Sequence, residues 1–456
     1  MKITFIADTH HYSKTLGTTG KAYELRSGSD QKCLAETGEI IDAAFKQIAE
    51  SDTDAVFILG DVSNDGEMVS HIEFREKLYE LKKSKPVFVI TATHDWCCDG
   101  NPRRFDGDTV SNDVEVMKSE ELPEFYKDFG PEQAIDSFIT KIGTICYTIQ
   151  LSEKVRVLCL NDDKNEDDHA GFTEDCWQWI ERQIENAKRD GCLLIGAEHH
   201  LLMPHISPLI AGGSVCVANR EYVASRFADA GLRYMFVGHS HMQSTAKFKS
   251  KKKNTIIEVN VGSLCGYPAP IVNVTVNDDD TITYDVDHLK KFVLNGSEIE
   301  AMPFLAGHAT DLINRVLECK TKAEFTEKLT ALQLNGARLS RYWIFAKPLL
   351  HKLNTMLDYD VYKILRSFGL AKYVPKSAAQ RYHYKPLKEF MGEVFLSALD
   401  GALDPKEKGS DYYELVMGVI IGISRLKNDE KLTKKLIAMF DNLLTGGEIN
   451  NQHATI

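Results

Sequence analysis

Long apolar runs are missing from this chain of 456 residues. No uninterrupted stretch reaches the roughly 18 to 20 residues that a membrane-spanning helix needs, and the N-terminal segment reaches an acidic residue, Asp8, too early for a signal peptide. We therefore expect a cytoplasmic protein with no transmembrane segment. Hydrophobic residues make up 43% and charged residues 26% of the chain, which is typical of a soluble protein with more than one core.

Cysteine pairs of the C-x-x-C type are also absent, although the chain has ten cysteines. Scattered single cysteines predict neither a disulfide framework nor a zinc ribbon, so reduced thiols are the simpler interpretation. Cys97 and Cys98 lie close to a histidine and an aspartate, His94 and Asp95, so a thiolate ligand is an alternative there.

The chain lacks an excess of basic residues, because 54 Lys and Arg stand against 66 Asp and Glu and the net charge is -12. From residue 291 onward the chain carries 23 Lys and Arg against 19 Asp and Glu, so the acidity belongs to residues 1–290. Because nucleic-acid binding depends on Lys and Arg contacts to phosphates, we expect no general nucleic-acid binding. A small phosphorylated substrate attracted by bound cations is compatible with this charge.

Short apolar strands alternate with amphipathic helices over residues 1–290, which is the pattern of an α/β domain. Strands are predicted at residues 2–7, 55–59, 87–91, 147–151, 155–160, 193–197, 234–237, 245–248, 256–261, 271–276 and 282–286. From about residue 302 a periodicity of 3.6 residues takes over, as at Leu312, Val316 and Cys319. The sequence therefore predicts a domain of residues 1–290 followed by an all-helical domain of residues 300–456.

Within the helical part, residues 341–388 combine ten Lys and Arg with many aromatic residues. Such a mixture can bind an anionic ligand or a membrane face. The simpler interpretation is that the aromatic residues fill a helical core while the basic residues face solvent.

Five short motifs each follow a predicted strand. They are Asp8-Thr9-His10, Gly60-Asp61, Thr93-His94-Asp95, Glu198-His199-His200 and Gly238-His239-Ser240-His241. Because the carboxyl ends of the strands of an α/β sheet lie along one edge, residues far apart in the chain can meet there. Each motif alone has little meaning, but all five occur in order and each at the end of a strand.

Carboxylates and imidazoles are the ligands that a pair of divalent ions requires. Two ions about 3.5 to 4 Å apart can lower the pKa of a shared water and bind phosphoryl oxygens. An acid for the leaving group completes such chemistry, and His94, with Asp95 to orient it or bias its charge, is the predicted catalytic pair.

These motifs together resemble those of the calcineurin-like metallophosphoesterase superfamily, whose ordered blocks are D-x-H, G-D, G-N-H-D/E, a lone His and G-H-x-H. Further stretches look like the bacterial class III cyclic nucleotide phosphodiesterases, namely residues 60–67, Ser70-His71, residues 125–130 and a helical extension behind the catalytic domain. The resemblance implies an α/β (α+β sandwich) fold, with two packed β-sheets flanked by helices.

The resemblance also implies the roles of individual residues. Asp8, His10 and His241 would bind one metal ion, and His199 and His239 would bind the second. Asp61 would bridge the two ions, and His94 would face the substrate phosphate. His200 is an alternative to His199. The cofactors implied are two divalent or trivalent ions, Mn, Fe or Zn.

One position departs from the family pattern, because Thr93 stands where the family has the metal-binding Asn. Thr93 or a water could fill this position, the second ion could bind weakly, or turnover could be lost. We predict a dimetal phosphoesterase that hydrolyses phosphodiesters or phosphomonoesters of small molecules through a metal-bridged water, with cyclic nucleotides as one candidate class. The alternative is a catalytically weak or silent metal- and phosphate-binding protein whose helical domain binds a partner. The sequence indicates no oligomeric state.

Overall fold

Two β-sheets form the centre of the fold in the computed structural model, which describes residues 1–164, 169–205, 215–331, 335–425 and 430–456. The first sheet has six strands in the order β17-β14-β13-β1-β2-β3. Their bounds are His453–Thr455, Ile282–His288, Pro270–Val276, Lys2–Ile6, Ala55–Leu59 and Val87–Ile90. Strands β1, β2 and β3 run parallel, whereas β13 joins β1 in antiparallel register.

The second sheet has seven strands in the order β11-β12-β10-β9-β8-β7-β6. Their bounds are Ser244–Lys249, Thr255–Asn260, Tyr234–Val237, Leu193–Ala197, Val155–Cys159, Ile145–Ser152 and Asp136–Ile139. Its central strands β12, β10, β9 and β8 are parallel. All the strands predicted from the sequence are present.

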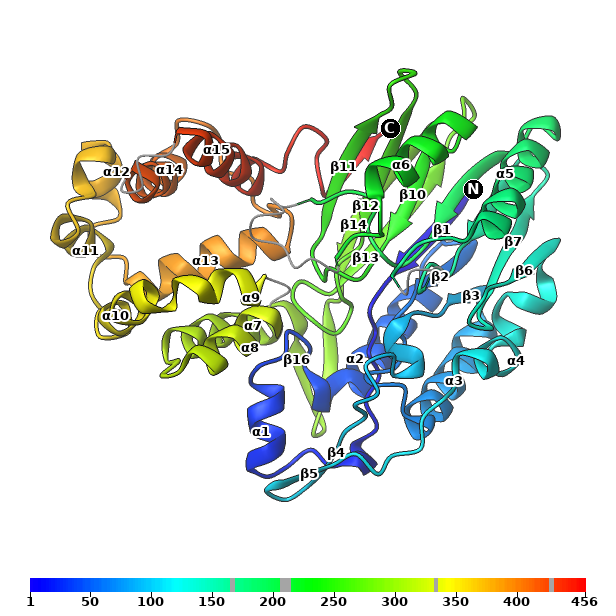
Figure 1. Cartoon of the computed structure of the whole chain (residues 1–456), viewed down its shortest axis with the longest axis horizontal. Coiled ribbons are helices and arrows are strands. Elements are labelled where there is room, and N and C mark those ends of the chain that lie inside the picture. Colours follow the sequence, from blue (N-terminus) through cyan, green and yellow to red (C-terminus); the bar gives the residue numbers. More distant parts are fainter. Residues whose placement is uncertain (165–168, 206–214, 332–334, 426–429) are drawn as a thin grey trace.

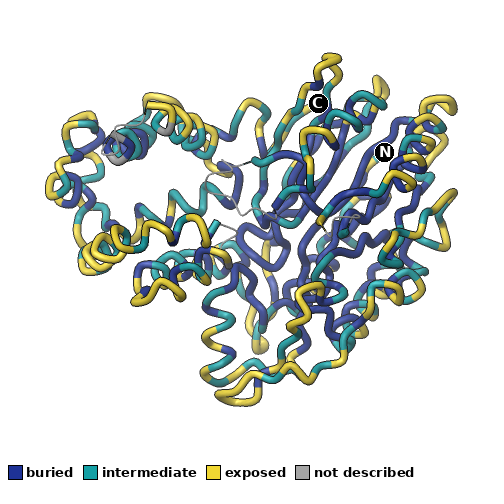
Figure 2. Tube along the Cα trace, in the orientation of Figure 1, coloured by how far each residue is buried: buried dark blue, intermediate teal, exposed yellow. Residues whose placement is uncertain are grey.

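The two sheets pack face to face through alternate residues of their strands, as expected for a side-chain period of two. Phe5 of β1 stacks on Phe236 of β10 with ring centroids 4.1 Å apart, and Phe57 of β2 stacks on Phe88 of β3 at 4.8 Å. These rings belong to one core cluster that contains residues of both sheets. Figure 2 shows the strands as the most completely buried part of the chain.

Helices cover the outer face of each sheet (Figure 1). Helices α2 (Thr37–Ala49) and α3 (Met68–Lys82) pack on the first sheet, and α5 (Glu174–Arg189) and α6 (Arg220–Ala230) pack on the second. Shorter elements at the rim are α1 (Lys21–Ser27), α4 (Leu122–Phe125) and the hairpin of β4 (Arg104–Asp106) and β5 (Thr109–Ser111). The predicted sandwich of two sheets flanked by helices is confirmed.

A helical region follows the hairpin of β15 (Lys291–Leu294) and β16 (Ser297–Glu300). Its helices are α7 (Ala301–Leu317), α8 (Lys322–Ala331), α9 (Gly336–Leu339), α10 (Trp343–Asn354), α11 (Val361–Ser367), α12 (Lys376–Arg381), α13 (Leu387–Leu399), α14 (Asp411–Arg425) and α15 (Glu430–Thr445). The region is not helical to its end, because β17 returns to pair with β14. The division into two domains near residue 290 therefore stays a prediction.

The aromatic residues of 341–388 divide between two environments. Tyr362, Phe368 and Tyr382 pack against the helical core. Phe345 and Tyr384 are 76% and 84% exposed, so only some of the aromatic residues in this segment contribute to the helical core. None of the helices in the described ranges combines the length and the apolar character needed to span a bilayer.

The stacked rings between the sheets lead to a stability prediction. Replacing Phe57 by Ala removes a fully buried ring and should lower the free energy of unfolding by about 3–5 kcal/mol. The measurement is urea denaturation followed by circular dichroism. Tyr222→Ala, at a side chain that is 59% exposed on α6, is the control and should cost less than about 1 kcal/mol. Equal losses in the two variants would contradict the assignment of this core.

Candidate metal centre

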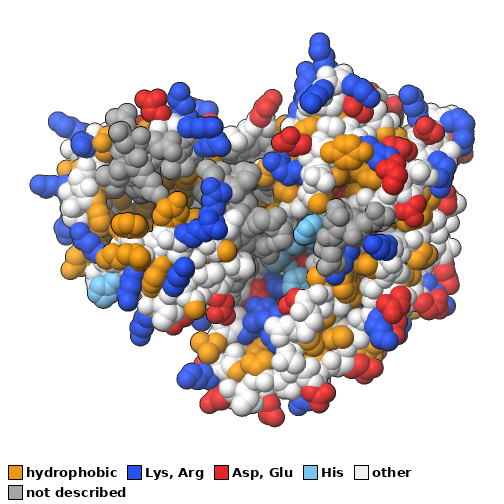
Figure 3. All heavy atoms as spheres, viewed as in Figure 1, with side chains coloured by type: hydrophobic (Ala, Val, Ile, Leu, Met, Phe, Trp, Pro, Cys, Tyr) orange, Lys and Arg blue, Asp and Glu red, His pale blue; other side chains and the backbone are white. Residues whose placement is uncertain are grey.

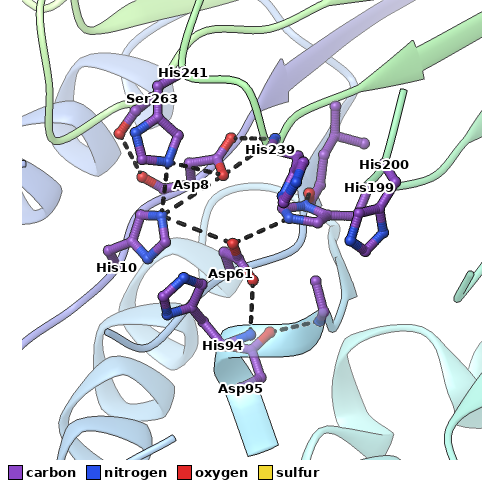
Figure 4. A network of polar contacts seen from close by, with 12 residues as sticks. Asp8, His10, Asp61, His94, Asp95, His199, His200, His239, His241 and Ser263 are labelled. Carbon is purple, nitrogen blue, oxygen red and sulfur yellow. Dashed lines mark hydrogen bonds and ion pairs between the residues drawn. The ribbon is translucent and has the colours of Figure 1, made fainter. Parts of the chain in front are cut away.

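The five motifs meet at one edge of the sandwich, at the carboxyl ends of strands from both sheets (Figure 4). Asp8 and His10 follow β1, and Asp61 follows β2 in the same sheet. His199 follows β9, and His239 follows β10, in the other sheet. The centre therefore lies where the two sheets face each other, and neither sheet alone contains it.

Asp8, His10, Asp61, His239 and His241 have their backbone in the left-handed region, which residues other than glycine adopt rarely and at a cost of about 1–3 kcal/mol each. The φ angles are 52° at Asp8, 41° at His10, 49° at Asp61, 68° at His239 and 58° at His241. Hydrogen bonds hold this conformation, since the amides of Asp8 and His10 donate to the carbonyls of Gly60 and Asp61 at 3.2 and 2.9 Å. The turns direct the side chains of each motif into the same space.

The first cluster consists of Asp8, His10 and His241. The Nε2 atoms of His10 and His241 are 3.1 Å apart, and they lie 3.6 and 3.5 Å from Oδ1 of Asp8. Donor atoms bound to one ion at about 2.1 Å lie about 3.4 Å apart at tetrahedral angles. The three distances are thus those of a set of ligands around one metal ion.

The second cluster consists of Asp61, His199 and His239. Nδ1 of His199 donates to the carbonyl of Leu59 at 2.7 Å, which directs Nε2 toward Oδ2 of Asp61 at 3.0 Å. A hydrogen bond of this kind fixes the tautomer of a metal-binding histidine. Among the described residues, Nε2 of His239 is buried without a hydrogen-bond partner, as expected of a nitrogen that binds a metal ion.

Asp61 lies between the two clusters. Its carboxylate is 3.0 Å from Nε2 of His199 on one side and 3.8 Å from Nε2 of His10 on the other. Its second oxygen accepts a hydrogen bond from the amide of His94 at 3.0 Å. This is the position that a carboxylate shared by two metal ions requires.

The pKa shifts of Asp8, His10 and His239 favour the protonation states that bind metals. Burial acts against ionisation of Asp8, but hydrogen bonds with His10 and His241 lower the pKa of Asp8 below its usual value. Burial, followed by the charge of Lys32, lowers the pKa of His10 to about 3. Burial also lowers the pKa of His239 well below its usual value. Ionised carboxylates and neutral imidazoles are the forms that bind metal ions. His199 is the exception: burial lowers its pKa, but the charges of Asp61 and Asp8 outweigh burial and raise the pKa well above its usual value.

His94 lies beside the two clusters on the 3-10 helix η3 (Thr93–Trp96), and 35% of its side chain is exposed. Its Nδ1 donates to the carbonyl of Asn64 and lies 3.6 Å from Oδ1 of Asp65. Burial lowers the pKa of His94, but the charges of Asp61 and Asp65 outweigh burial and raise the pKa above its usual value. His94 can therefore hold a proton beside the two clusters.

Asp95 does not orient His94, so this part of the sequence prediction is corrected. Its carboxylate accepts hydrogen bonds from the amides of Ser63 and Ala92 at 2.9 and 2.7 Å, because the 3-10 helix turns the side chain toward its own N-terminus. Asp95 ties the loops after β2 and β3 together. The carboxylate beside His94 is Asp65, which sequence reasoning missed; its place four residues after Asp61 was the available signal.

His199, rather than His200, joins the cluster of Asp61. His200 turns to Asp162, whose Oδ1 lies 3.0 Å from its Nδ1. Asp162, Asp163 and His200 form a third group with the spacing of metal ligands. Sequence reasoning missed both aspartates, although they follow β8 at the same edge of the sheet.

Thr93 begins the 3-10 helix and lines a cavity together with His200 and His239. Its role as a metal ligand stays a prediction. Cys97 is buried, and burial raises the pKa of its thiol to about 12, which disfavours a thiolate ligand. All ten cysteines are free, as predicted.

The sequence model of the calcineurin-like phosphoesterase family matches residues 1–243, which is more than half of the chain. The chain belongs to this family. It is therefore a metal-dependent phosphoesterase, and the two clusters fit the dinuclear metal centre of the family. No curated protein matches the sequence.

Several solved structures are similar to this chain at low identity. A dimetal phosphatase from Danio rerio is 11% identical with a TM-score of 0.44, covering 66% of this chain and 99% of its own. A purple acid phosphatase from yellow lupin seeds is 14% identical with a TM-score of 0.40, covering 66% and 52%. A putative 5'-nucleotidase from Staphylococcus aureus is 11% identical with a TM-score of 0.36, covering 66% and 55%. The chain thus spans only about half the length of the last two proteins.

Thr93 leads to a prediction on metal affinity. Thr93→Asn adds an amide oxygen beside the second cluster and should raise the affinity for the more weakly bound Mn²⁺ about tenfold, or ~1.4 kcal/mol. The measurement is calorimetric titration of chelator-treated protein. Thr109→Asn, on the exposed strand β5, is the control and should change nothing. Unchanged affinity in Thr93→Asn would show that another side chain already completes the site.

Proposed function

We propose that this phosphoesterase hydrolyses phosphate monoesters or diesters of small molecules at a centre of two metal ions, Mn, Fe or Zn. The observation that carries the proposal is the position of Asp61 between the two clusters. Asp8, His10 and His241 would hold one ion, and His199 and His239 the other, with Thr93 as a further ligand of the second. The first ion would then have ligands from the ends of strands in both sheets. The second would have His199 and His239 from one sheet and the shared carboxylate of Asp61 from the other.

The reaction is the replacement of an ester oxygen at phosphorus by a water oxygen. One P–O bond forms, the P–O bond to the leaving group breaks, and the leaving oxygen takes up a proton. Bound metal ions would lower the pKa of the attacking water and stabilise the charge on the phosphoryl oxygens. The chain itself holds the ligands in place through strained turns and through hydrogen bonds such as that from His199 to Leu59.

His94 would supply the proton to the leaving oxygen. Its Nδ1 is engaged by the carbonyl of Asn64, which leaves Nε2 as the atom that can face a substrate. Burial lowers the pKa of His94, but the charges of Asp61 and Asp65 raise it above its usual value. Asp65 would thus act as a positioning residue in the place that the sequence assigned to Asp95.

Nucleotides, including cyclic nucleotides, are the substrates that the sequence resemblance implies, and they remain a prediction. The second candidate function is a phosphate-binding protein with little or no turnover. The observation in its favour is Thr93 at the position of the usual Asn. The two candidates differ in whether the metal-loaded protein turns over a phosphoester.

Asp61→Asn tests the proposed centre. Loss of the shared charge should lower the metal content of the purified protein below two ions per chain and lower kcat for bis(p-nitrophenyl) phosphate about 100-fold or more, a loss of ~2.7 kcal/mol. Metal analysis and steady-state kinetics are the measurements. Asp278→Asn, in an exposed turn, is the matched control. If the Mn²⁺-loaded native protein and Asp61→Asn show the same background rate, the binding function is favoured instead.

His94→Gln tests the proton donor with two leaving groups. For an alkyl phosphate, whose alcohol must be protonated as it leaves, kcat should fall about 100-fold or more. For p-nitrophenyl phosphate, whose leaving group needs no proton, the fall should be less than about tenfold. Metal content should not change, and His453→Gln at the exposed end of the chain is the control. Equal losses for both substrates would show that His94 does not act as the acid.

A further inference from the structure

A cavity of about 1840 Å³ opens beside the metal centre, and it is larger than the 300–1,000 Å³ of most small-molecule sites. One side is formed by Thr93, His200 and His239, and the opposite side by helices α13 and α15. Figure 3 looks into the hollow between the sandwich and the helical region, where histidine side chains lie at depth. The centre and the two helices therefore border one continuous space.

The helical side of this cavity is apolar. Apart from the buried Leu399, the lining residues on α13 are Met391, Val394, Phe395 and Ala398, whose spacing places them on one face of the helix. On α15 the lining residues are Met439, Phe440 and Leu443. We call these seven residues the apolar wall.

The apolar wall lies at the edge of the helical core and not inside it. Leu387 and Phe390 of α13 are buried in that core. Every residue of the apolar wall is only half buried. Partly exposed apolar side chains facing a cavity are stabilised by an apolar ligand that displaces water from them.

Basic side chains border the same cavity. Lys249, Lys251 and Lys252 lie at the turn between β11 and β12, and all three are exposed. Lys252 lies 3.6 Å from Asp229, and Asp163 and Glu221 line the same cavity, so the charges at its edge are mixed. The space thus combines a charged edge, a metal-binding end and an apolar wall.

We propose that the substrate is an amphiphilic phosphoester, with its phosphate at the metal centre and an alkyl chain against the apolar wall. This rests on the proposed function and narrows its substrate class. The side chains of the wall offer no strong hydrogen-bond donor or acceptor, so they suit an alkyl group better than a nucleotide base, whose polar edge would be left unpaired.

The test uses the Mn²⁺-loaded full chain and p-nitrophenyl alkyl phosphates with methyl, butyl and octyl groups, below their critical micelle concentrations. The leaving group is the same throughout, so only the alkyl contact changes. We expect kcat/KM to rise at least about tenfold from methyl to octyl, mainly through KM. Equal values for the three esters would overturn the inference.

Two variants of the apolar wall sharpen the test. Phe395→Asp places a charge in the wall, and Ala398→Trp fills the space in front of it. Both should remove the advantage of the octyl ester and leave the methyl ester within about twofold of the native rate. Phe345→Asp, at a side chain that is 76% exposed on α10 and does not line the cavity, is the matched control and should keep the advantage.

The outcomes separate this inference from the proposed function. Turnover of the methyl ester without dependence on chain length would overturn the substrate class alone. Absence of turnover for all three esters would overturn the proposed function together with it. Self-association that Phe395→Asp abolishes, without a chain-length effect, would assign the apolar wall to a second copy of the chain and overturn the inference.

Discussion

The structure depends on the confinement of two carboxylates and four imidazoles in one largely buried space. Asp8, His10 and Asp61 are buried, and several of their histidine partners have ring nitrogens without a hydrogen bond in the described residues. Burying ionised and polar groups in this way is unfavourable unless cations compensate them. The chain belongs to a metal-binding family, and bound metal ions would compensate these buried groups. Without such ions the arrangement would only destabilise the fold.

The packing of the two sheets sets the distance across this space. Phe5 lies three residues before Asp8, and Phe236 lies three residues before His239. Their rings stack at 4.1 Å between β1 and β10, which holds the ends of the two strands at a defined separation. The amide of His239 in turn donates to the carboxylate of Asp8 at 2.9 Å. A contact in the core thus determines the geometry at the edge.

The helical region is attached to the sandwich close to the metal centre. The amide of Gln243, two residues after His241, donates to the carbonyl of Leu399 at the end of α13 at 2.8 Å. The hydroxyl of Tyr267 donates to Asp400 at 2.7 Å, and the amide side chain of Gln243 donates to the carbonyl of Asn451. These bonds, with the return of β17 to the first sheet, hold α13 opposite the centre.

The sequence by itself determined eleven strands of the sandwich and the kinds of residue that meet at their ends, because a side-chain period of two and the position of a motif after a strand are local properties. It did not indicate β6 or β17 at the two sheet edges, nor the order of the strands within the sheets. Asp8, Asp61 and His199 could therefore be assigned to one edge of the sheet from these local patterns. Thr93 could likewise be recognised as a departure from the family pattern.

The tertiary structure alone decided which of two neighbouring side chains faces the centre. His199 points to Asp61 while His200 turns to Asp162, and Asp65 rather than Asp95 lies beside His94. These directions depend on partners from distant parts of the chain, such as Leu59 for His199 and Ser63 for Asp95, which no local pattern encodes. The cavity between His239 and α13 was equally unpredictable, because its two sides come from parts of the chain more than a hundred residues apart.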